Sequence, residues 1–189
     1  IFPDATCLER DVVDLLRHEL QSPVTSPAAV LLAGGRTPLA AYAALAAEPL
    51  HISDRWHALY SDDRHVPVTD PRSNAGVITP LLRQLGFSPG RIMQVDGTDE
   101  LEAAAGGYAR QLAAFFDAGG RIPLGLLGLG ADGHTASLFN AEQVAAGRGR
   151  WAQAVARPDG LNGVSVTADL LTRVARVIFL VTGEEKRSA

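Results

Sequence analysis

The sequence predicts a single α/β domain built on a doubly wound, mostly parallel β-sheet with helices on both faces. The first observation behind this prediction is a series of short, uninterrupted apolar runs, of which residues 28–33 and 124–129 are the clearest. Such runs are typical of strands that are buried on both faces of a parallel sheet. The second observation is that these runs alternate along the chain with segments of helical periodicity, as in chains that wind helices over both faces of one sheet.

Each predicted strand and helix follows from a local pattern. Strands are expected at residues 28–33, 56–60, 92–95, 124–129, 152–156, 164–167 and 176–181. Helices are expected at residues 8–20, 37–47, 73–85 and 100–117, with a short helix at 135–139 and another that begins near residue 183. In the first helix, Leu8, Val12 and Leu16 recur at helical spacing. Thr37 is expected to cap the second helix, and Pro80 to interrupt the third.

Length and composition restrict the class of protein. The 189 residues suit one domain, which we expect to span residues 1–189. We also expect this domain to be incomplete at its C-terminus, because the helix that begins near residue 183 has too few residues. Apolar residues make up 47% of the chain and charged residues 20%, as in ordinary globular proteins.

Charge and cysteine content narrow the range of partners. The formal net charge is -4, and Lys and Arg form no continuous stripe, which argues against a nucleic-acid groove or an anionic membrane surface. No apolar run approaches the roughly 18 residues of a membrane-spanning helix. The single cysteine, Cys7, has no partner for an internal disulfide. We therefore expect a cytoplasmic monomer with no nucleic-acid or membrane partner.

Three polar loops follow predicted strands, at residues 34–37, 61–74 and 130–135. In a doubly wound sheet, ligands bind outside the carboxyl ends of the strands. We therefore expect the functional residues to lie in these three loops.

The first loop suits phosphate binding. Gly34 and Gly35 allow backbone amides to approach an anion, and the start of the next helix adds free N–H groups and the positive end of its dipole. Thr37 adds a hydroxyl group, and Arg36 adds a positive charge. The alternative is a tight strand-to-helix turn with a capping threonine, which is the favoured interpretation when this loop is taken alone.

The second loop combines a cation with two carboxylates. Arg64 can pair with a phosphate through two N–H groups, and Asp62 or Asp63 can orient it or a base. The alternative is a solvated loop with a local Asp–Arg pair, which is favoured when the loop is taken alone. Together with His57 and His65, these carboxylates match no standard metal spacing, so no metal is expected.

The third loop contains a candidate general base. Histidine side chains in general titrate near neutral pH and can take a proton from water, which makes His134 the candidate, and Asp132 can hold its tautomer and stabilise the imidazolium. The alternative is a helix-capping histidine. Residues 128–133 also fit a dinucleotide-binding glycine pattern, but they come late in the chain and no acid lies near Gln153, so we reject that assignment.

The three loops together resemble one enzyme family. Residues 126–139, LLGLGADGHTASLF, closely resemble the signature of the 6-phosphogluconolactonases. AGGRTP at 33–38 resembles the Gly-Gly-Ser-Thr-Pro loop of that family, and DDRHVP at 62–67 with Ser73-Asn74 resembles its Asp-Glu-Arg-x-Val-Pro and Ser-Asn pair. The segment 177–186, which ends in TGEEK, resembles its late strand and Gly-x-x-Lys.

This resemblance implies a Rossmann-like fold shared with glucosamine-6-phosphate deaminases. It also implies hydrolysis of 6-phospho-D-glucono-1,5-lactone to 6-phosphogluconate in the oxidative pentose phosphate pathway, without a cofactor or a metal. In this chain His134 would activate water and Asp132 would support it. The residues that would hold the phosphate or the sugar are Gly34, Gly35, Arg36, Thr37, Asp62, Arg64 and, more weakly, Lys186.

The sequence departs from the family pattern at several positions. Arg36 replaces the usual serine, Asp63 replaces the usual glutamate, and Asn140 stands where proline is common. Gly163 falls where the family has an arginine, so we expect a phosphate-site cation to be missing and Arg36 and Arg64 to compensate for it.

Three alternatives to a lactonase remain open. One is an isomerase and deaminase acting on glucosamine 6-phosphate, whose family has Gly-His-Ile-Ala-Phe-Asn where this chain has GHTASLF. The second is a non-catalytic sugar-phosphate sensor on the same fold, and the third is an inactive fragment. Ammonia release would identify the deaminase, and ligand binding without turnover would identify the sensor.

Overall fold

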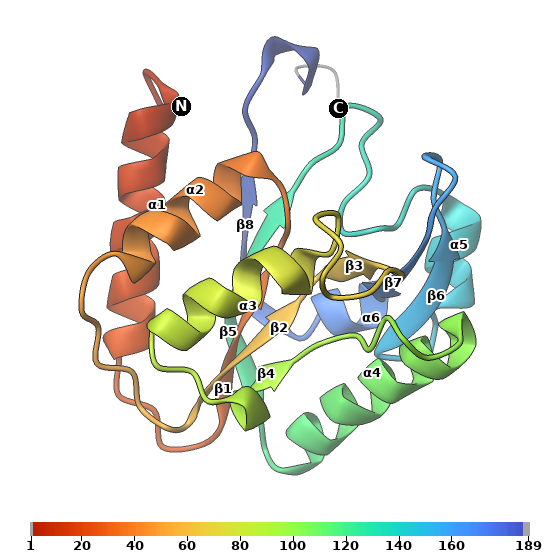
Figure 1. Cartoon of the computed structure of the whole chain (residues 1–189), viewed down its shortest axis with the longest axis horizontal. Helices are drawn as coiled ribbons and strands as arrows, with labels where there is room; N and C mark the ends of the chain where they lie inside the picture. Colours follow the sequence, from red (N-terminus) through yellow and green to blue (C-terminus); the bar gives the residue numbers. More distant parts are fainter. Residues whose placement is uncertain (1, 187–189) are drawn as a thin grey trace.

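A five-stranded parallel sheet forms the centre of the molecule, in a computed structural model that describes residues 2–186 (Figure 1). Its strand order is β4-β2-β1-β5-β8, and every neighbouring pair is parallel. The strands are β1 (Ala28–Leu32), β2 (Trp56–Tyr60), β4 (Ile92–Met93), β5 (Arg121–Gly128) and β8 (Val174–Leu180). This sheet confirms the predicted doubly wound α/β class.

A second, antiparallel sheet has the order β3-β7-β6. Its strands are β3 (Asp62–Arg64), β7 (Asn162–Val166) and β6 (Ala152–Ala156). The sequence predicts β6 and β7 as strands but predicts β3 as part of a polar loop, which is wrong. Asp63 pairs with Val164, about 100 residues away along the chain, so long-range pairing rather than local pattern makes this polar segment a strand.

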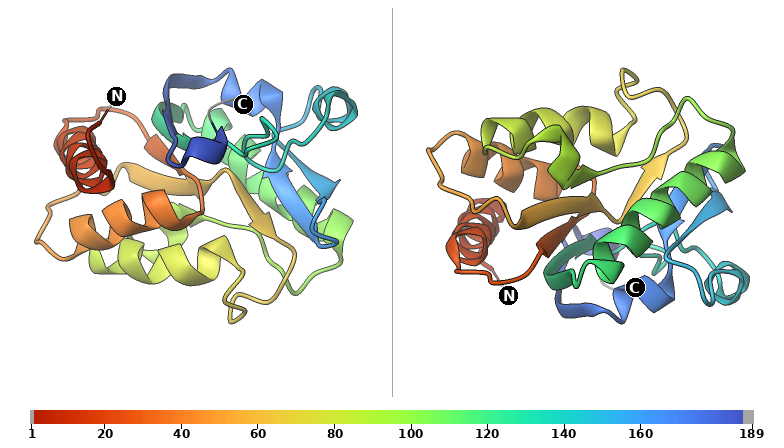
Figure 2. Two further views of the ribbon diagram at one scale, coloured as in Figure 1. Left: turned by 90° about the horizontal axis from the view of Figure 1, so that it is seen from above. Right: turned by 90° about the horizontal axis from the view of Figure 1, so that it is seen from below.

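Helices cover both faces of the central sheet (Figure 2). The α-helices are α1 (Ala5–Gln21), α2 (Arg36–Ala46), α3 (Asn74–Gln84), α4 (Leu101–Asp117), α5 (Ala141–Ala146) and α6 (Ala168–Leu171), with 3-10 turns η1 (Pro89–Arg91) and η2 (Glu184–Lys186). Apolar side chains of α1, α2 and α3 pack on one face, and those of α4, α6 and the small sheet pack on the other.

The central strand β1 is apolar throughout because both of its faces are buried. Val30 and Leu32 belong to the core beneath α1–α3, whereas Ala29 and Leu31 belong to the core beneath α4. Successive side chains point to opposite faces of a strand, so both sets are buried only if both faces are covered. None of the four is more than 2% exposed.

Three local predictions differ from the structure. No helix forms at residues 135–139, where Thr135 and Leu138 make an isolated bridge; the helix begins at Ala141, and the Asn140 side chain caps it. Gly35, not Thr37, is the N-cap of α2, with φ at 110°. Pro80 does not interrupt α3, which continues to Gln84 with Pro80 exposed to solvent.

The helix predicted to begin near residue 183 is only the turn η2, and its expected continuation lies outside the described residues. Among helices within 2–186, none is both long enough and apolar enough to cross a bilayer.

Candidate active site

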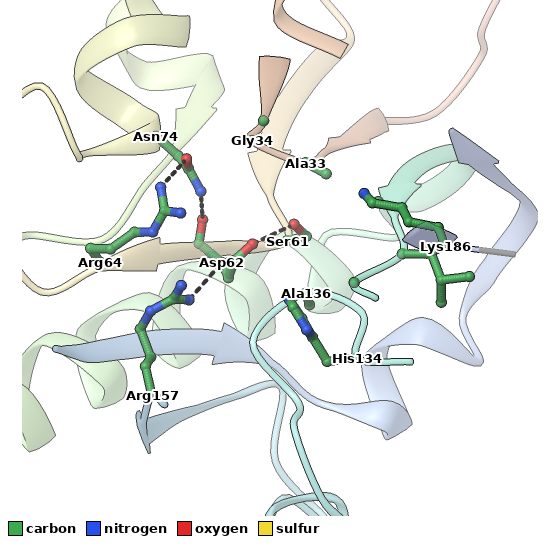
Figure 3. A pocket seen from close by; sticks show the side chains of 14 residues that line it. Ala33, Gly34, Ser61, Asp62, Arg64, Asn74, His134, Ala136, Arg157 and Lys186 are labelled. Carbon is green, nitrogen blue, oxygen red and sulfur yellow. Dashed lines mark hydrogen bonds and ion pairs between the residues drawn. The ribbon is translucent and has the colours of Figure 1, made fainter. Parts of the chain in front are cut away.

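The three predicted loops meet around one cavity of about 210 Å³ at the carboxyl edge of the central sheet (Figure 3). β1, β2 and β5 are parallel neighbours, so the segments that follow them emerge at the same edge. The cavity wall consists of Ala33, Gly34, Gly35, Ser61, Asp62, Arg64, Asn74, Gly128, Leu129, Gly130, His134, Ala136, Arg157 and Lys186.

His134 lies in the cavity wall with its ring held from one side. Its Nδ1 lies 2.5 Å from Oδ1 of Asp132, and its backbone N–H donates to the same oxygen at 3.2 Å. This hydrogen bond lowers the pKa of Asp132, so the carboxylate stays ionised and Nδ1 is the nitrogen that carries the proton. Nε2 is therefore the basic nitrogen of neutral His134 and is available to take a proton from water.

The loop around His134 depends on two glycines. Gly133 adopts φ of 84°, a conformation that favours glycine. The N–H of Gly130 donates to the His134 carbonyl at 2.8 Å, and a Cβ on Gly130 would overlap His134 Nδ1 and Asp132 Oδ1. The ring of Phe139 packs against the imidazole with centroids 4.4 Å apart. The imidazole thus contacts Asp132, the backbone of Gly130 and the ring of Phe139, although its side chain remains 28% exposed.

Asp132 supports His134 from outside the cavity. Its side chain is 55% exposed and does not contribute to the cavity wall. The predicted pair is therefore present, with the imidazole toward the cavity and the carboxylate toward solvent.

Arg64 lies in the cavity wall at the end of β3. Its Nη1 donates to the Arg72 carbonyl at 3.0 Å and to Oδ1 of Asn74 at 3.1 Å. The Asn74 Nδ2 in turn donates to the Asp62 carbonyl at 2.9 Å. Asn74 was not predicted as a site residue, although the Ser-Asn pair that contains it is a feature of the resemblance.

Asp62, which was predicted to bind substrate, lies in the cavity wall but bonds other protein groups. Its Oδ1 accepts from Ser61 Oγ at 2.8 Å, and its Oδ2 accepts from Ser137 Oγ at 2.7 Å and lies 3.6 Å from Arg157 Nη1. Both carboxylate oxygens thus have protein partners, and the side chain is buried. Its contacts join β3 to the loop after His134.

Arg157 is a cavity residue that the sequence did not predict. It follows β6, its side chain is only 8% exposed, and its Nη1 donates to Ser137 Oγ at 2.5 Å. A Cβ on Gly163 would come within 2.9 Å of the Asp63 carbonyl oxygen and 3.1 Å of Arg157 Cδ, so glycine leaves room for the neighbouring strand and for this arginine. Position 163 carries no cation, as expected, but the guanidinium of Arg157 lies in the cavity wall. The only local signal was an arginine directly after a predicted strand.

The diglycine loop lines the cavity through its backbone. The described part of the chain offers no acceptor to the amide N–H groups of Gly34 and Gly35. The other two predicted residues of the loop lie elsewhere: Arg36 is exposed and outside the wall, and the Thr37 hydroxyl bonds that of Thr182 at 2.9 Å. The tertiary contact with Thr182 thus uses the hydroxyl that was expected to bind phosphate.

The cavity wall is positively charged. Arg64, Arg157 and Lys186 contribute three cations to the wall and Asp62 one carboxylate, and Arg157 is also paired with Asp159, which lies outside the wall. Figure 3 shows Lys186 entering from the side opposite Arg64, with His134 between the two cations in this view. Within residues 2–186, no three His, Cys, Asp or Glu side chains gather as a metal site would require. The fold and this cavity match those of an α/β enzyme, with an imidazole and three cationic side chains in the cavity wall.

Comparison with known proteins agrees with this class. Residues 3–189 match the model of the family described as glucosamine-6-phosphate isomerases/6-phosphogluconolactonase. The chain is 32% identical to the 6-phosphogluconolactonase of Treponema pallidum, over 99% of this chain and 80% of that one. It is 36% identical to that of Synechocystis, over 85% and 68%. The crystal structure of 6-phosphogluconolactonase from Thermotoga maritima superposes with a TM-score of 0.82 at 27% identity, covering 97% of this chain and 82% of that one.

The chain belongs to the glucosamine-6-phosphate isomerase/6-phosphogluconolactonase family. The family and the fold that the motifs predicted are thereby confirmed.

Proposed function

We propose that this chain is a 6-phosphogluconolactonase, which hydrolyses 6-phospho-D-glucono-1,5-lactone to 6-phosphogluconate. The relatives reported above carry this name, in agreement with the activity expected from the motifs. A cavity lined by three cations suits the phosphate of such a substrate. As part of the same proposal, the protein is a cytoplasmic monomer that needs neither a metal nor an organic cofactor.

The observation that carries the mechanism is the orientation of His134. Because Nδ1 is bonded to Asp132, Nε2 accepts the proton of a water molecule as that water attacks the lactone carbonyl. The carboxylate of Asp132 then stabilises the imidazolium, as in hydrolytic triads. The imidazolium returns its proton to the ring oxygen as the C–O bond breaks, which leaves the neutral base and the product as a carboxylic acid, and this acid then releases its proton to solvent.

Other cavity residues bind the substrate and stabilise the negative charge that develops on it during the reaction. The free amides of Gly34 and Gly35 lie at the N-terminus of α2, where the helix dipole favours an anion. Arg64, Arg157 and Lys186 supply the positive charge for the phosphate. Binding the phosphate fixes the far end of the substrate and lowers the entropic cost of bringing the lactone carbonyl to His134.

Replacing the base tests this mechanism. His134→Ala should lower kcat by about 10²–10⁴-fold, the usual contribution of a general base, with the inhibition constant of inorganic phosphate unchanged. The measurement is the rate of lactone opening, corrected for spontaneous hydrolysis, over a range of pH. The base limb of the pH profile should disappear with His134.

A matched control is His18→Ala, since His18 is exposed on α1 away from the cavity, and this variant should keep the wild-type rate. Full activity of His134→Ala would show that another group activates the water. Ammonia release from glucosamine 6-phosphate would instead point to the isomerase branch of the family, and binding without turnover would point to a sensor.

A further inference from the structure

The side chain of Asn74 occupies the space that a side chain on Gly34 would need. A Cβ on Gly34 would overlap the carboxamide of Asn74, and the three nearest atoms to it all belong to this one group. Gly34 does not have the positive φ that itself favours glycine. The contact with Asn74, and not the backbone conformation, therefore accounts for glycine at this position.

Asn74 is held in one orientation from two sides. Its backbone N–H donates to Oδ1 of Asp63 at 2.6 Å, which fixes its position at the start of α3. Its Nδ2 donates to the Asp62 carbonyl at 2.9 Å, so Oδ1 is the end of the amide that points to Arg64. The side chain is 4% exposed. A buried amide with both ends bonded is a rigid acceptor for the arginine.

This acceptor determines which edge of Arg64 is free. Nη1 of Arg64 bonds both Asn74 Oδ1 and the Arg72 carbonyl, so its two N–H groups are used. Within residues 2–186, Nε and Nη2 have no acceptor. These two nitrogens form one edge of the planar guanidinium, and that edge matches two oxygens of a phosphate.

We propose that Asn74 is a positioning residue that sets Arg64 for an anionic substrate group, and that position 34 is glycine to admit Asn74. This inference rests on the proposed function in one respect, because it takes Arg64 as a substrate-binding residue. A diglycine loop suggests that glycine at position 34 lets a phosphate approach the backbone closely. In this inference, glycine at position 34 instead leaves space for the side chain of Asn74.

A double-mutant cycle separates the two roles of Gly34. Asn74→Ala removes the acceptor and should raise KM and the inhibition constant of inorganic phosphate about tenfold, as expected for loss of one hydrogen bond to a charged group. The value of kcat should change far less, because His134 is not touched. Gly34→Ala should show the same pattern, because the new methyl group displaces the amide.

The double variant Gly34→Ala/Asn74→Ala gives the decisive comparison. It should match Asn74→Ala within about twofold in KM and phosphate inhibition, since additivity fails when one residue acts only through the other. A Gly34→Ala effect that multiplies in full on the Asn74→Ala background would overturn the inference, because the added methyl group would then obstruct the substrate itself and not Asn74. Unchanged KM and phosphate inhibition in Asn74→Ala would overturn it as well.

One further variant tests whether Arg64 binds substrate, and another is a control for the addition of a methyl group to a glycine. Arg64→Ala tests the underlying function: if it leaves KM unchanged, Arg64 does not bind substrate and the inference fails for that reason. Gly90→Ala is the matched control, because a Cβ there meets open space, and it should behave as the wild type. If Gly34→Ala alone fails to fold, the comparison of the double variant with Asn74→Ala still decides between the two roles.

Discussion

At the scale of single residues, the clearest requirement is the absence of a side chain at Gly130. The backbone of Gly130 bonds the His134 carbonyl, and the imidazole and the Asp132 carboxylate lie where its Cβ would be. Gly130 does not adopt a positive φ, so alanine is permitted by its backbone conformation. Glycine at this position therefore leaves space for the side chains of His134 and Asp132 to pack against the backbone.

Gly130→Ala should lower kcat about 100-fold while the protein stays folded, because a displaced imidazole loses general-base catalysis. The measurement is the steady-state rate of lactone opening, together with a thermal unfolding curve. Gly107→Ala in α4 is the control, since only the tip of Arg110 lies near its Cβ. A wild-type kcat for Gly130→Ala would mean that the pair tolerates rearrangement.

The sequence predicts some site residues better than others, for a physical reason. Asp132 and His134 are two residues apart, so one loop determines their contact. Asp62 and Ser137 are 75 residues apart and Arg157 lies in a third segment, so their contacts depend on how three distant segments pack together. Arg157 also pairs locally with Asp159, but its contacts with Ser137 and Asp62 come from distant segments and could not be read from the sequence.

At the scale of elements, a buried carboxylate holds the start of α3. Asp63 accepts from the backbone N–H groups of Asn74 at 2.6 Å and Ala75 at 3.0 Å, and from the Ser73 hydroxyl at 3.1 Å. These N–H groups are among those that a helix leaves unpaired at its first turn. The predicted start of the helix at Ser73 is confirmed, since the Ser73 side chain accepts from Gly76. The contribution of Asp63 from a neighbouring strand appears only in the folded chain.

The stability of the protein should depend on pH through Asp63 in an unusual direction. Burial raises the pKa of Asp63 above 3.8, despite the hydrogen bonds that oppose the shift. The folded state then holds this proton more tightly than the unfolded chain, so the contribution is largest in acid and falls as pH rises through the window above 3.8. From about pH 7 to about pH 4, the wild type should gain stability relative to Asp63→Asn.

Urea unfolding of both proteins at each pH measures this difference. Asp70→Asn is a control of opposite sign, because hydrogen bonds from Arg72 lower the pKa of Asp70 to about 2. Stability from Asp70 is present above the unfolded pKa and is lost as pH falls. If the wild type instead loses stability relative to Asp63→Asn toward acid pH, the hydrogen bonds outweigh burial at Asp63.

At the scale of the whole molecule, two apolar cores share one sheet. Leu16 of α1 lies in the core on one face, and Leu112 of α4 lies in the core on the other. The strands between them contribute alternate residues to each core, so neither core can be lost while the sheet stays intact. We therefore expect both cores to unfold together.

Leu16→Ala and Leu112→Ala should each cost about 2–5 kcal/mol of the free energy of unfolding, because both side chains are almost fully buried. Each variant should retain one transition that coincides in far-UV circular dichroism and tryptophan fluorescence. Val68→Ala, at a side chain 52% exposed, should cost little. Separate transitions in the two probes would show that the faces unfold independently.

The sequence by itself determined the α/β class, most helices and strands, the family and the His134–Asp132 pair. These features depend on apolar periodicity and on contacts within a few residues, which a linear pattern records. Tertiary structure alone decided that residues 62–64 form a strand, that Arg157 lies in the cavity wall, that Thr37 bonds Thr182 and that Asn74 fills the space beside Gly34. In these contacts, segments from different parts of the chain meet in space, and which groups meet depends on how the sheet and its helices pack.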